Sequence, residues 1–412
     1  MRKVSLVLGL FFVCAVLIVP GKIFADIFDL TISSEGSSYH ESYSSVDSIM
    51  DSINEDYIRR HIPHYTDMSA ATGDINFRGV PVSLSFMEGS SELMLSIPSI
   101  GVEEIFMGHT RDDSVDQLEE WFESEGGSAL TRLMQALAAN TPNDPIAGNP
   151  NSLMANIVET DFDSAFTSNA SSLDQAINDD SNVIGLALRY GMYDHGDTDS
   201  THLSLPLSYT IRLKESGNRI KFKMPIAMTE VEGARAFNFG LGMEFGWKIS
   251  DTWELSPAFN YAAVGSKDLG SVGQIASGAL TSAKRIDFGD YQLNIGNMIG
   301  YYRTLKFSHD DYSFDPDIAN TVFRNGIMIS VPSEVIFKKT SVEFFLTDTR
   351  YIGSDLYVDQ YNEIGFSFGY SKPKKGNGSS KISKYLEYLR FGLTYLYSEE
   401  SKGFSVNMGY SF

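Results

Sequence analysis

From Val183 to the end of the chain, large apolar residues alternate with small or polar ones, and this two-residue period returns in segment after segment. In one such segment, residues 237–249, Phe, Leu, Met, Trp and Ile take every second position, while Asn, Gly, Glu and Lys take the others. Because successive side chains of a β-strand point to opposite sides of its sheet, each such segment predicts a strand with one apolar and one polar face.

Twelve segments carry this pattern, and most are longer than the roughly 5–6 residues of strands in soluble sheets. They are residues 183–193, 202–213, 219–229, 236–249, 252–263, 272–286, 290–304, 319–331, 339–349, 360–371, 387–398 and 403–412. A tilted strand that crosses a bilayer needs about 9–11 residues. The even number and the uniform contrast between faces predict an all-β membrane barrel of 12 antiparallel strands, residues 182–412, rather than a secreted soluble β-sandwich.

The polar face of these segments is expected to line the lumen, and its charges have both signs. The lumen-facing charges that we predict are Arg189, Arg212, Lys221, Lys223, Glu244, Glu254, Glu343, Glu363 and Arg390. A mixture of signs can form internal salt bridges that close a narrow barrel, or it can line a small polar pore. A lining of one sign would have predicted ion selectivity, and the sequence does not have one.

Residues 1–25 have the features of a secretory signal peptide. Arg2 and Lys3 precede an apolar run from Val4 to Val19, and a short segment ends at Ala25, where we expect cleavage. The alternative is an uncleaved membrane anchor, but the apolar run is shorter than the roughly 20 residues that span a bilayer. The single cysteine of the chain, Cys14, lies inside this segment.

The region after the signal peptide is strongly acidic. Residues 26–180 contain 28 acidic and five basic residues, and no lysine. Nucleic-acid binding requires a basic surface, so this composition argues against it. Residues 26–75 are rich in Ser, Asp and Glu with little periodicity, which predicts a largely flexible segment.

Residues 76–163 are predicted to form a small α+β module. A β-hairpin is expected around Gly89, with alternating apolar residues on both sides of the turn. Two helices should follow, the first capped by Asp112 or Asp113. Their apolar stripes are Leu118, Trp121 and Phe122 in the first helix, and Leu130, Leu133, Met134 and Leu137 in the second.

Residues 164–181 link the module to the barrel and have some helical character. About 17 helical residues would span roughly 25 Å, which is close to the height of the apolar band of a membrane barrel. Two interpretations are open. The linker threads the lumen and carries the module to the outside, or it is a periplasmic tether.

We find no motif that predicts catalysis, a cofactor or a metal. The chain has no GxSxG, HExxH, Walker loop or CxxC. Asp194, His195, Asp197 and Asp199 offer ligands for a weak divalent-cation site, although a solvated polar loop is the simpler interpretation. His202 and the serines near it leave open the class of outer-membrane lipid hydrolases, without supporting it.

The chain ends with GFSVNMGYSF, in which Phe404, Val406, Met408, Tyr410 and Phe412 occupy alternate positions. This ending resembles the C-terminal signal of Gram-negative outer-membrane proteins. The resemblance implies recognition by the barrel-assembly machinery, delivery by periplasmic chaperones and insertion into the lipid bilayer of the outer membrane.

The 12 strands, the segment DYQLNIGNMIGYYRTL and the segment NDPIAGNPNSLMANIVETDF are similar to solitary autotransporter-type outer-membrane barrels, which lack a large passenger. The resemblance implies a barrel that anchors, exports or displays the acidic N-terminal module without catalysis, with a periplasmic or surface partner for that module. The alternative function is a small polar pore with the module as a plug or periplasmic adaptor. The basic segment from Lys372 to Lys384 departs from the pattern.

If the terminal phenylalanine is the assembly signal, Phe412→Ser or a C-terminal extension should impair insertion. We expect less heat-modifiable protein in outer-membrane fractions, as measured by electrophoresis of heated and unheated samples. Normal amounts of membrane-inserted, heat-modifiable protein from both variants would contradict this prediction.

Overall fold

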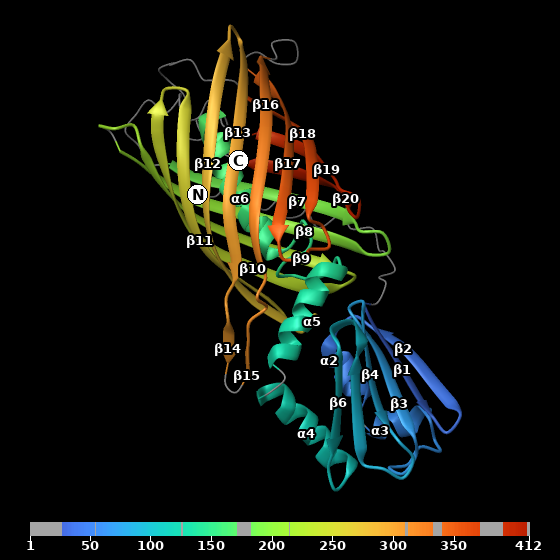
Figure 1. Ribbon diagram of the computed structural model, residues 1–412. Helices are drawn as coiled ribbons and strands as arrows, with labels where there is room; N and C mark the ends of the chain where they lie inside the picture. The colour runs from blue at the N-terminus through green and yellow to red at the C-terminus, as the bar shows by residue number, and fades with distance from the viewer. Residues whose placement is uncertain are drawn as a thin grey trace, which may run out of the picture.

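The computed structural model describes residues 27–53, 55–124, 127–170, 183–213, 215–309, 312–332, 340–370 and 390–409. It shows a closed β-barrel, a helix inside the barrel, and a smaller sheet with helices beyond one end of the barrel (Figure 1). The predicted signal peptide and the basic segment from Lys372 to Lys384 lie outside the described residues.

The barrel wall has 12 antiparallel strands, as the sequence predicted, and it closes through pairing of the last strand with the first. The strands are β7 (Val183–Asp194), β8 (Asp199–Arg212), β9 (Arg219–Val231), β10 (Ala234–Ser250), β11 (Trp253–Ser266), β12 (Ser271–Phe288), β13 (Tyr291–Thr304), β16 (Ala319–Pro332), β17 (Thr340–Gly353), β18 (Gln360–Tyr370), β19 (Arg390–Tyr397) and β20 (Lys402–Gly409). Between β13 and β16, β14 (Phe307–His309) and β15 (Tyr312–Phe314) form a hairpin that extends from one end of the barrel (Figure 1).

Each barrel strand presents large apolar side chains to the outside and small or polar ones to the lumen. In β10, Phe237 is 60% exposed, whereas its neighbour Asn238 is 5% exposed. Within the predicted assembly signal, Phe404 and Val406 face outward, and residues 410–412 lie outside the described residues. The outer wall is therefore an apolar surface that is suited to lipid.

A six-stranded antiparallel sheet lies before the barrel in the chain, with the order β2-β1-β3-β4-β5-β6. Its strands are β1 (Phe28–Ser34), β2 (Ser37–Tyr43), β3 (Ala71–Phe77), β4 (Val80–Phe86), β5 (Glu92–Ile97) and β6 (Val102–Met107), and a short 3-10 helix, η1 (Pro98–Ile100), precedes β6. Helices α2 (Val46–Ser52) and α3 (Glu55–His61) lie between β2 and β3. We call residues 27–140 the N-terminal module.

The prediction that residues 26–75 are largely flexible is wrong for most of that segment, which forms β1, β2, α2, α3 and β3. Few apolar residues suffice here because they are placed on alternate positions of β1. Phe28, Leu30 and Ile32 are all buried. Ile62 and Tyr65, which follow α3, pack against Leu30 and Ile32.

Helices α4 (Arg111–Ser124) and α5 (Gly127–Asn140) match the two predicted helices, and β4 and β5 match the predicted hairpin. Their apolar stripes pack against the sheet, where Leu93, Leu95, Phe106 and Leu137 share one core.

The linker helix, α6 (Leu153–Ala170), begins well before the predicted boundary at residue 164. The first part of this helix is therefore sequence that we had assigned to the module. Residues 171–182, the rest of the predicted linker, lie outside the described residues.

Candidate functional site

Helix α6 lies inside the lumen and packs closest to β11, β12 and β13 (Figure 1). Two glycines make room for its aromatic residues. Gly296 of β13 and Gly326 of β16 are direct partners in the sheet. A Cβ atom on Gly296 would lie 2.5 Å from the ring of Phe166, and one on Gly326 would lie 2.8 Å from the ring of Phe162. The absence of side chains at these two wall positions thus leaves space for the two phenylalanine rings of the helix.

The central polar contact between helix and wall is made by Asp161 of α6. Its carboxylate pairs with the ammonium group of Lys223 in β9. It also accepts hydrogen bonds from Asn260 Nδ2 and from the hydroxyl of Tyr302, each at 2.9 Å. Asp161, Lys223 and Tyr302 are all buried. Because a buried charge is costly unless it is paired and hydrogen-bonded, this contact fixes where the helix sits in the lumen.

Two further acidic residues of α6 meet arginines of the wall. Glu159 and Asp163 both pair with Arg189 of β7. Arg324 of β16 lies 3.9 Å from Asp163 and 2.6 Å from Glu363 of β18. The helix therefore presents acids to basic positions on both sides of the lumen.

Other predicted lumen charges pair within the wall. Arg219 bridges Glu244 at 2.8 Å and Glu254 at 2.6 Å, and Arg390 pairs with Glu343 at 3.1 Å. Lys221 donates a hydrogen bond to the carbonyl of Ser164 in α6 at 2.7 Å. Arg212 stands opposite Arg219 at the end of β8. The structure contains the internal salt bridges that the mixed signs allow.

Sequence reasoning missed five members of this network. Arg219 and Arg324 share the inward positions of the predicted lumen residues, so the alternation alone could have identified them. Glu159, Asp161 and Asp163 were missed because the helix was expected to begin after them.

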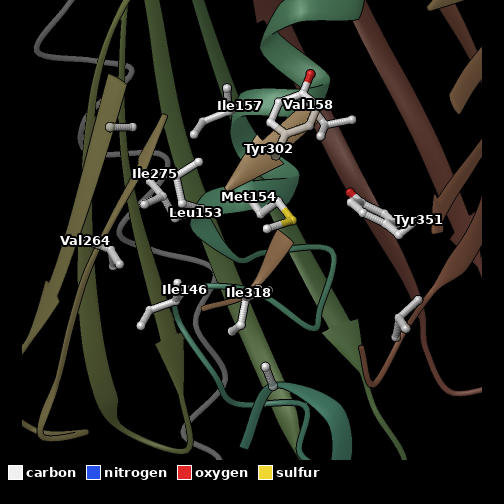
Figure 2. Close-up of a cluster of buried hydrophobic side chains, with 14 of the residues drawn as sticks. Ile146, Leu153, Met154, Ile157, Val158, Val264, Ile275, Tyr302, Ile318 and Tyr351 are labelled. Carbon is white, nitrogen blue, oxygen red and sulfur yellow. The ribbon is translucent and has the colours of Figure 1, made fainter. Parts of the chain in front are cut away.

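The mouth of the barrel is closed by residues 141–152, which we call the plug segment. Although it forms no regular element, it is almost completely buried. Asp144 Oδ1 accepts the backbone N–H groups of Ile146 and Ala147 at 2.9 and 3.0 Å, and Asn149 Nδ2 donates to the carbonyl of Asp144 at 2.7 Å. Ile146 lies among apolar side chains of helix and wall, including Leu153 and Ile318 (Figure 2). Side-chain amides and carboxylates thus satisfy backbone groups that a buried loop would otherwise leave unpaired.

Arg78, in the turn between β3 and β4, joins the module to this plug segment and to the barrel. It is 2% exposed and has a positive φ of 57°. Its guanidinium group donates to Asp144 Oδ2 at 3.0 Å, to the carbonyl of Asn143 at 3.2 Å and to the carbonyl of Leu269 at 3.4 Å. Burial lowers the pKa of Arg78 while the Asp144 carboxylate raises it, and an arginine remains charged at neutral pH.

The module also rests on three barrel loops at the same mouth. The N–H of Val46 donates to the carbonyl of Asp268 at 2.9 Å. The hydroxyl of Thr131 donates to the carbonyl of Asp315 at 2.6 Å, and the N–H of Tyr357 donates to the carbonyl of Ala138 at 2.8 Å. Plug segment and module together cover this end of the lumen.

The two histidines considered for a cation site or a hydrolase are buried and hydrogen-bonded to hydroxyl groups. Both ring nitrogens of His195 are hydrogen-bonded, Nδ1 with the hydroxyl of Ser401 at 2.6 Å and Nε2 with that of Ser200 at 2.9 Å. His195 is 3% exposed, and burial lowers its pKa to about 4, so the ring is neutral at pH 7. Asp194 instead faces Lys402 at 3.4 Å. His202 bonds Thr229 at 2.9 Å.

Within the described ranges, no three His, Cys, Asp or Glu side chains are grouped to hold a metal ion. None of the helices in the described part of the chain has the length and apolar character needed to cross a bilayer.

No protein-family model matches the chain, and no curated protein sequence matches it. Solved structures do. The beta domain of the Bordetella autotransporter BrkA has 13% identity and a TM-score of 0.42, covering 57% of this chain and 100% of its own. The translocator domain of the autotransporter NalP from Neisseria meningitidis has 11% identity and a TM-score of 0.42, and the match covers 58% of this chain and 90% of that domain. The NanC porin has 12% identity and a TM-score of 0.34, and the match covers 55% of this chain and 98% of the porin.

These similarities concern the barrel fold. The closed wall of 12 antiparallel strands, apolar outside and polar inside, is that of an outer-membrane β-barrel, and the outer membrane is its location. Autotransporter translocators and porins both appear among its structural neighbours.

Removing one partner of the central ion pair should destabilise the protein strongly. Asp161→Ala leaves Lys223 buried without its carboxylate, and we expect a loss of about 3–5 kcal/mol in the free energy of unfolding. The double variant Asp161→Leu/Lys223→Met removes both charges and should recover most of that loss. The free energies of unfolding of both variants can be measured by urea unfolding of reconstituted protein, monitored by tryptophan fluorescence. Equal losses in the single and double variants would contradict this reading of the contact.

Proposed function

We propose that the barrel is an outer-membrane anchor of the autotransporter translocator type that holds the acidic N-terminal module at the cell surface, with α6 and the plug segment as a fixed closure of its lumen. The observation that carries the proposal is the path of the chain through the barrel. It enters at one mouth with the plug segment and runs through the lumen as α6 toward the end where β7 begins.

The direction of α6 follows from its partners along the wall. Near its start, the carbonyl of Asn151 accepts a hydrogen bond from Thr229, close to the end of β9. Farther along, Asp161 meets Lys223, and Ser164 meets Lys221, close to the start of β9. The helix therefore runs opposite to β9 and ends on the side of the barrel where β7 starts.

The orientation in the membrane follows from the way such barrels are made. The chain arrives from the periplasm, and an even number of strands brings the start of β7 and the end of β20 to one side. The module packs at the opposite side. Two-residue connections lie on both sides, after β10 and β12 on the β7-start side and after β9 on the module's side, so connection length does not set the orientation. The support is that both ends of the barrel lie on the β7-start side, which faces the periplasm in single-chain barrels and leaves the module's side at the cell surface.

The contacts at the mouth support anchoring over transport. Arg78 ties the module to the plug segment and to the barrel loop at Leu269. The ion pairs of Asp161, Glu159 and Asp163 hold α6 to the wall. A transported passenger would need to leave these contacts, whereas a displayed module keeps them.

Accessibility of two engineered sites tests the orientation. A protease site inserted at Glu35–Gly36, the exposed turn between β1 and β2, should be cut when protease is added to intact cells. The matched control is the same site at Gly289–Asp290, between β12 and β13, which should be cut only after the outer membrane is permeabilised. The reverse pattern would place the module in the periplasm and contradict the proposal.

Conductance separates the anchor from the alternative of a small polar pore. Full-length protein in a planar bilayer should show no stepwise openings, because α6 and the plug segment occupy the lumen. A variant without residues 26–175 should conduct, which verifies insertion. Stepwise openings of the full-length protein would contradict a pure anchor and favour the pore.

A further inference from the structure

Two prolines lie side by side in the barrel wall. Pro206 is near the middle of β8, Pro225 is near the middle of β9, and the two are direct partners in the sheet. Proline has no N–H to donate to a neighbouring strand and is normally confined to sheet edges. A closed barrel has no edge, so each proline must interrupt the pairing on its other side.

The pairing is interrupted at those two places. Between β7 and β8 it runs to Leu186 opposite Leu207 and resumes only at Arg189 opposite Ser204. Between β9 and β10 it runs to Phe239 opposite Ile226 and resumes at Gly242 opposite Lys223. The β8–β9 ribbon is thus unpaired on both sides at one height, and the register is the same before and after each gap.

A cavity of about 80 Å³ lies directly behind this ribbon, between α6 and the wall. It exists because α6 packs toward β11, β12 and β13 and leaves the opposite half of the lumen less filled. Its lining combines polar residues, which include Glu159, Lys221 and Asn238, with apolar or small ones: Leu153, Ile157, Ala187, Pro206, Pro225 and Ala227.

The same cavity is also bordered by residues of the outer face. Leu188, Leu207 and Phe239 occupy outward positions of β7, β8 and β10, and they flank the two interruptions. At this height the cavity and the bilayer are therefore separated by a stretch of wall that lacks strand-to-strand pairing on both sides of the ribbon.

We propose that the ribbon of Pro206 and Pro225 forms a lateral port, in which the terminal segment of a linear hydrocarbon chain enters from the bilayer and lies against Leu153 and Ile157 of α6. The height of the port in the bilayer determines which part of a lipid can reach it. The middle of a membrane strand lies at the middle of the bilayer, where acyl-chain ends are found and headgroups are not. This site does not depend on which side of the membrane the module occupies.

The charges near the cavity favour entry of the methyl end. Arg189 is paired with Glu159 and Asp163, and Lys223 is paired with Asp161. A carboxylate or phosphate headgroup entering first would have to displace these acids of α6, whereas a chain end needs only the apolar lining.

Photoreactive lipids test the port in full-length protein reconstituted into phospholipid vesicles. One phospholipid carries a diazirine at the end of its acyl chain, and a second carries it beside the carbonyl. We expect the chain-end probe to label α6 at Leu153 or Ile157, identified by mass spectrometry of peptides, while the carbonyl probe labels only outward residues. Labelling of outward residues alone by both probes would overturn the proposal.

A further arm identifies the source of the chain. A free fatty acid with a terminal diazirine is added to vesicles of unlabelled phospholipid, and its labelling of α6 is compared with that of the phospholipid probe. Labelling by either probe supports the port and names its occupant. Absence of α6 labelling from both overturns it.

Three variants locate the site. We expect Ala227→Leu to lower α6 labelling about tenfold, because excluding two methylene groups from the cavity costs roughly that factor in binding. Pro206→Ala/Pro225→Ala restores two N–H donors and should lower labelling as well, which keeps the test available if Ala227→Leu fails to fold. The matched control is Pro257→Ala, because Pro257 interrupts the β10–β11 pairing but lies outside the cavity lining. Unchanged labelling in both test variants, or an equal loss in the control, would overturn the assignment.

Discussion

In hydrocarbon, backbone N–H and C=O groups need partners within the protein, and the pairing of β20 with β7 leaves the wall without a free strand edge. Closure with 12 strands also sets a narrow lumen that side chains and a single helix can fill. Polar residues then have only this lumen to occupy, since the outer face must be apolar. Closure of the barrel therefore explains why the charges point inward. It also explains why a helix fills the lumen and why the plug segment covers its mouth.

The charges of the lumen are shared between two parts of the chain. The wall contributes Arg189, Lys223 and Arg324, and α6 contributes the acids Glu159, Asp161 and Asp163. Neither part would be electrically satisfied alone, since an unpaired charge in this interior is costly. Wall and helix therefore stabilise each other, and without the helix the charges of the wall would depend on water in the lumen.

All 12 barrel strands could be predicted because alternation over long segments is a strong signal, and the lumen positions followed from it. The same alternation could have predicted that Arg219 and Arg324 face the lumen. The start of α6 could not be predicted in the same way, because Asp161 lies within the apolar face formed by Met154, Val158, Phe162 and Phe166 and obscures the stripe that marks a helix. In β1, the three buried apolar residues alternate with Asp, Thr and Ser and carried too weak a signal to predict a strand. The role of Arg78 depends on contacts with Asp144 and Leu269, far away in the chain, which no local pattern contains.

The plug segment is also the mechanical link between the module and the membrane. Its carbonyl at Gly148 accepts the N–H of Val358 in a barrel loop, and Arg78 binds it from the other side. A pull on the module would reach these contacts at the mouth before it reached α6. The pulling force would thus be carried by the rim of the barrel and passed through its wall to the bilayer. The helix in the lumen would carry little of this force.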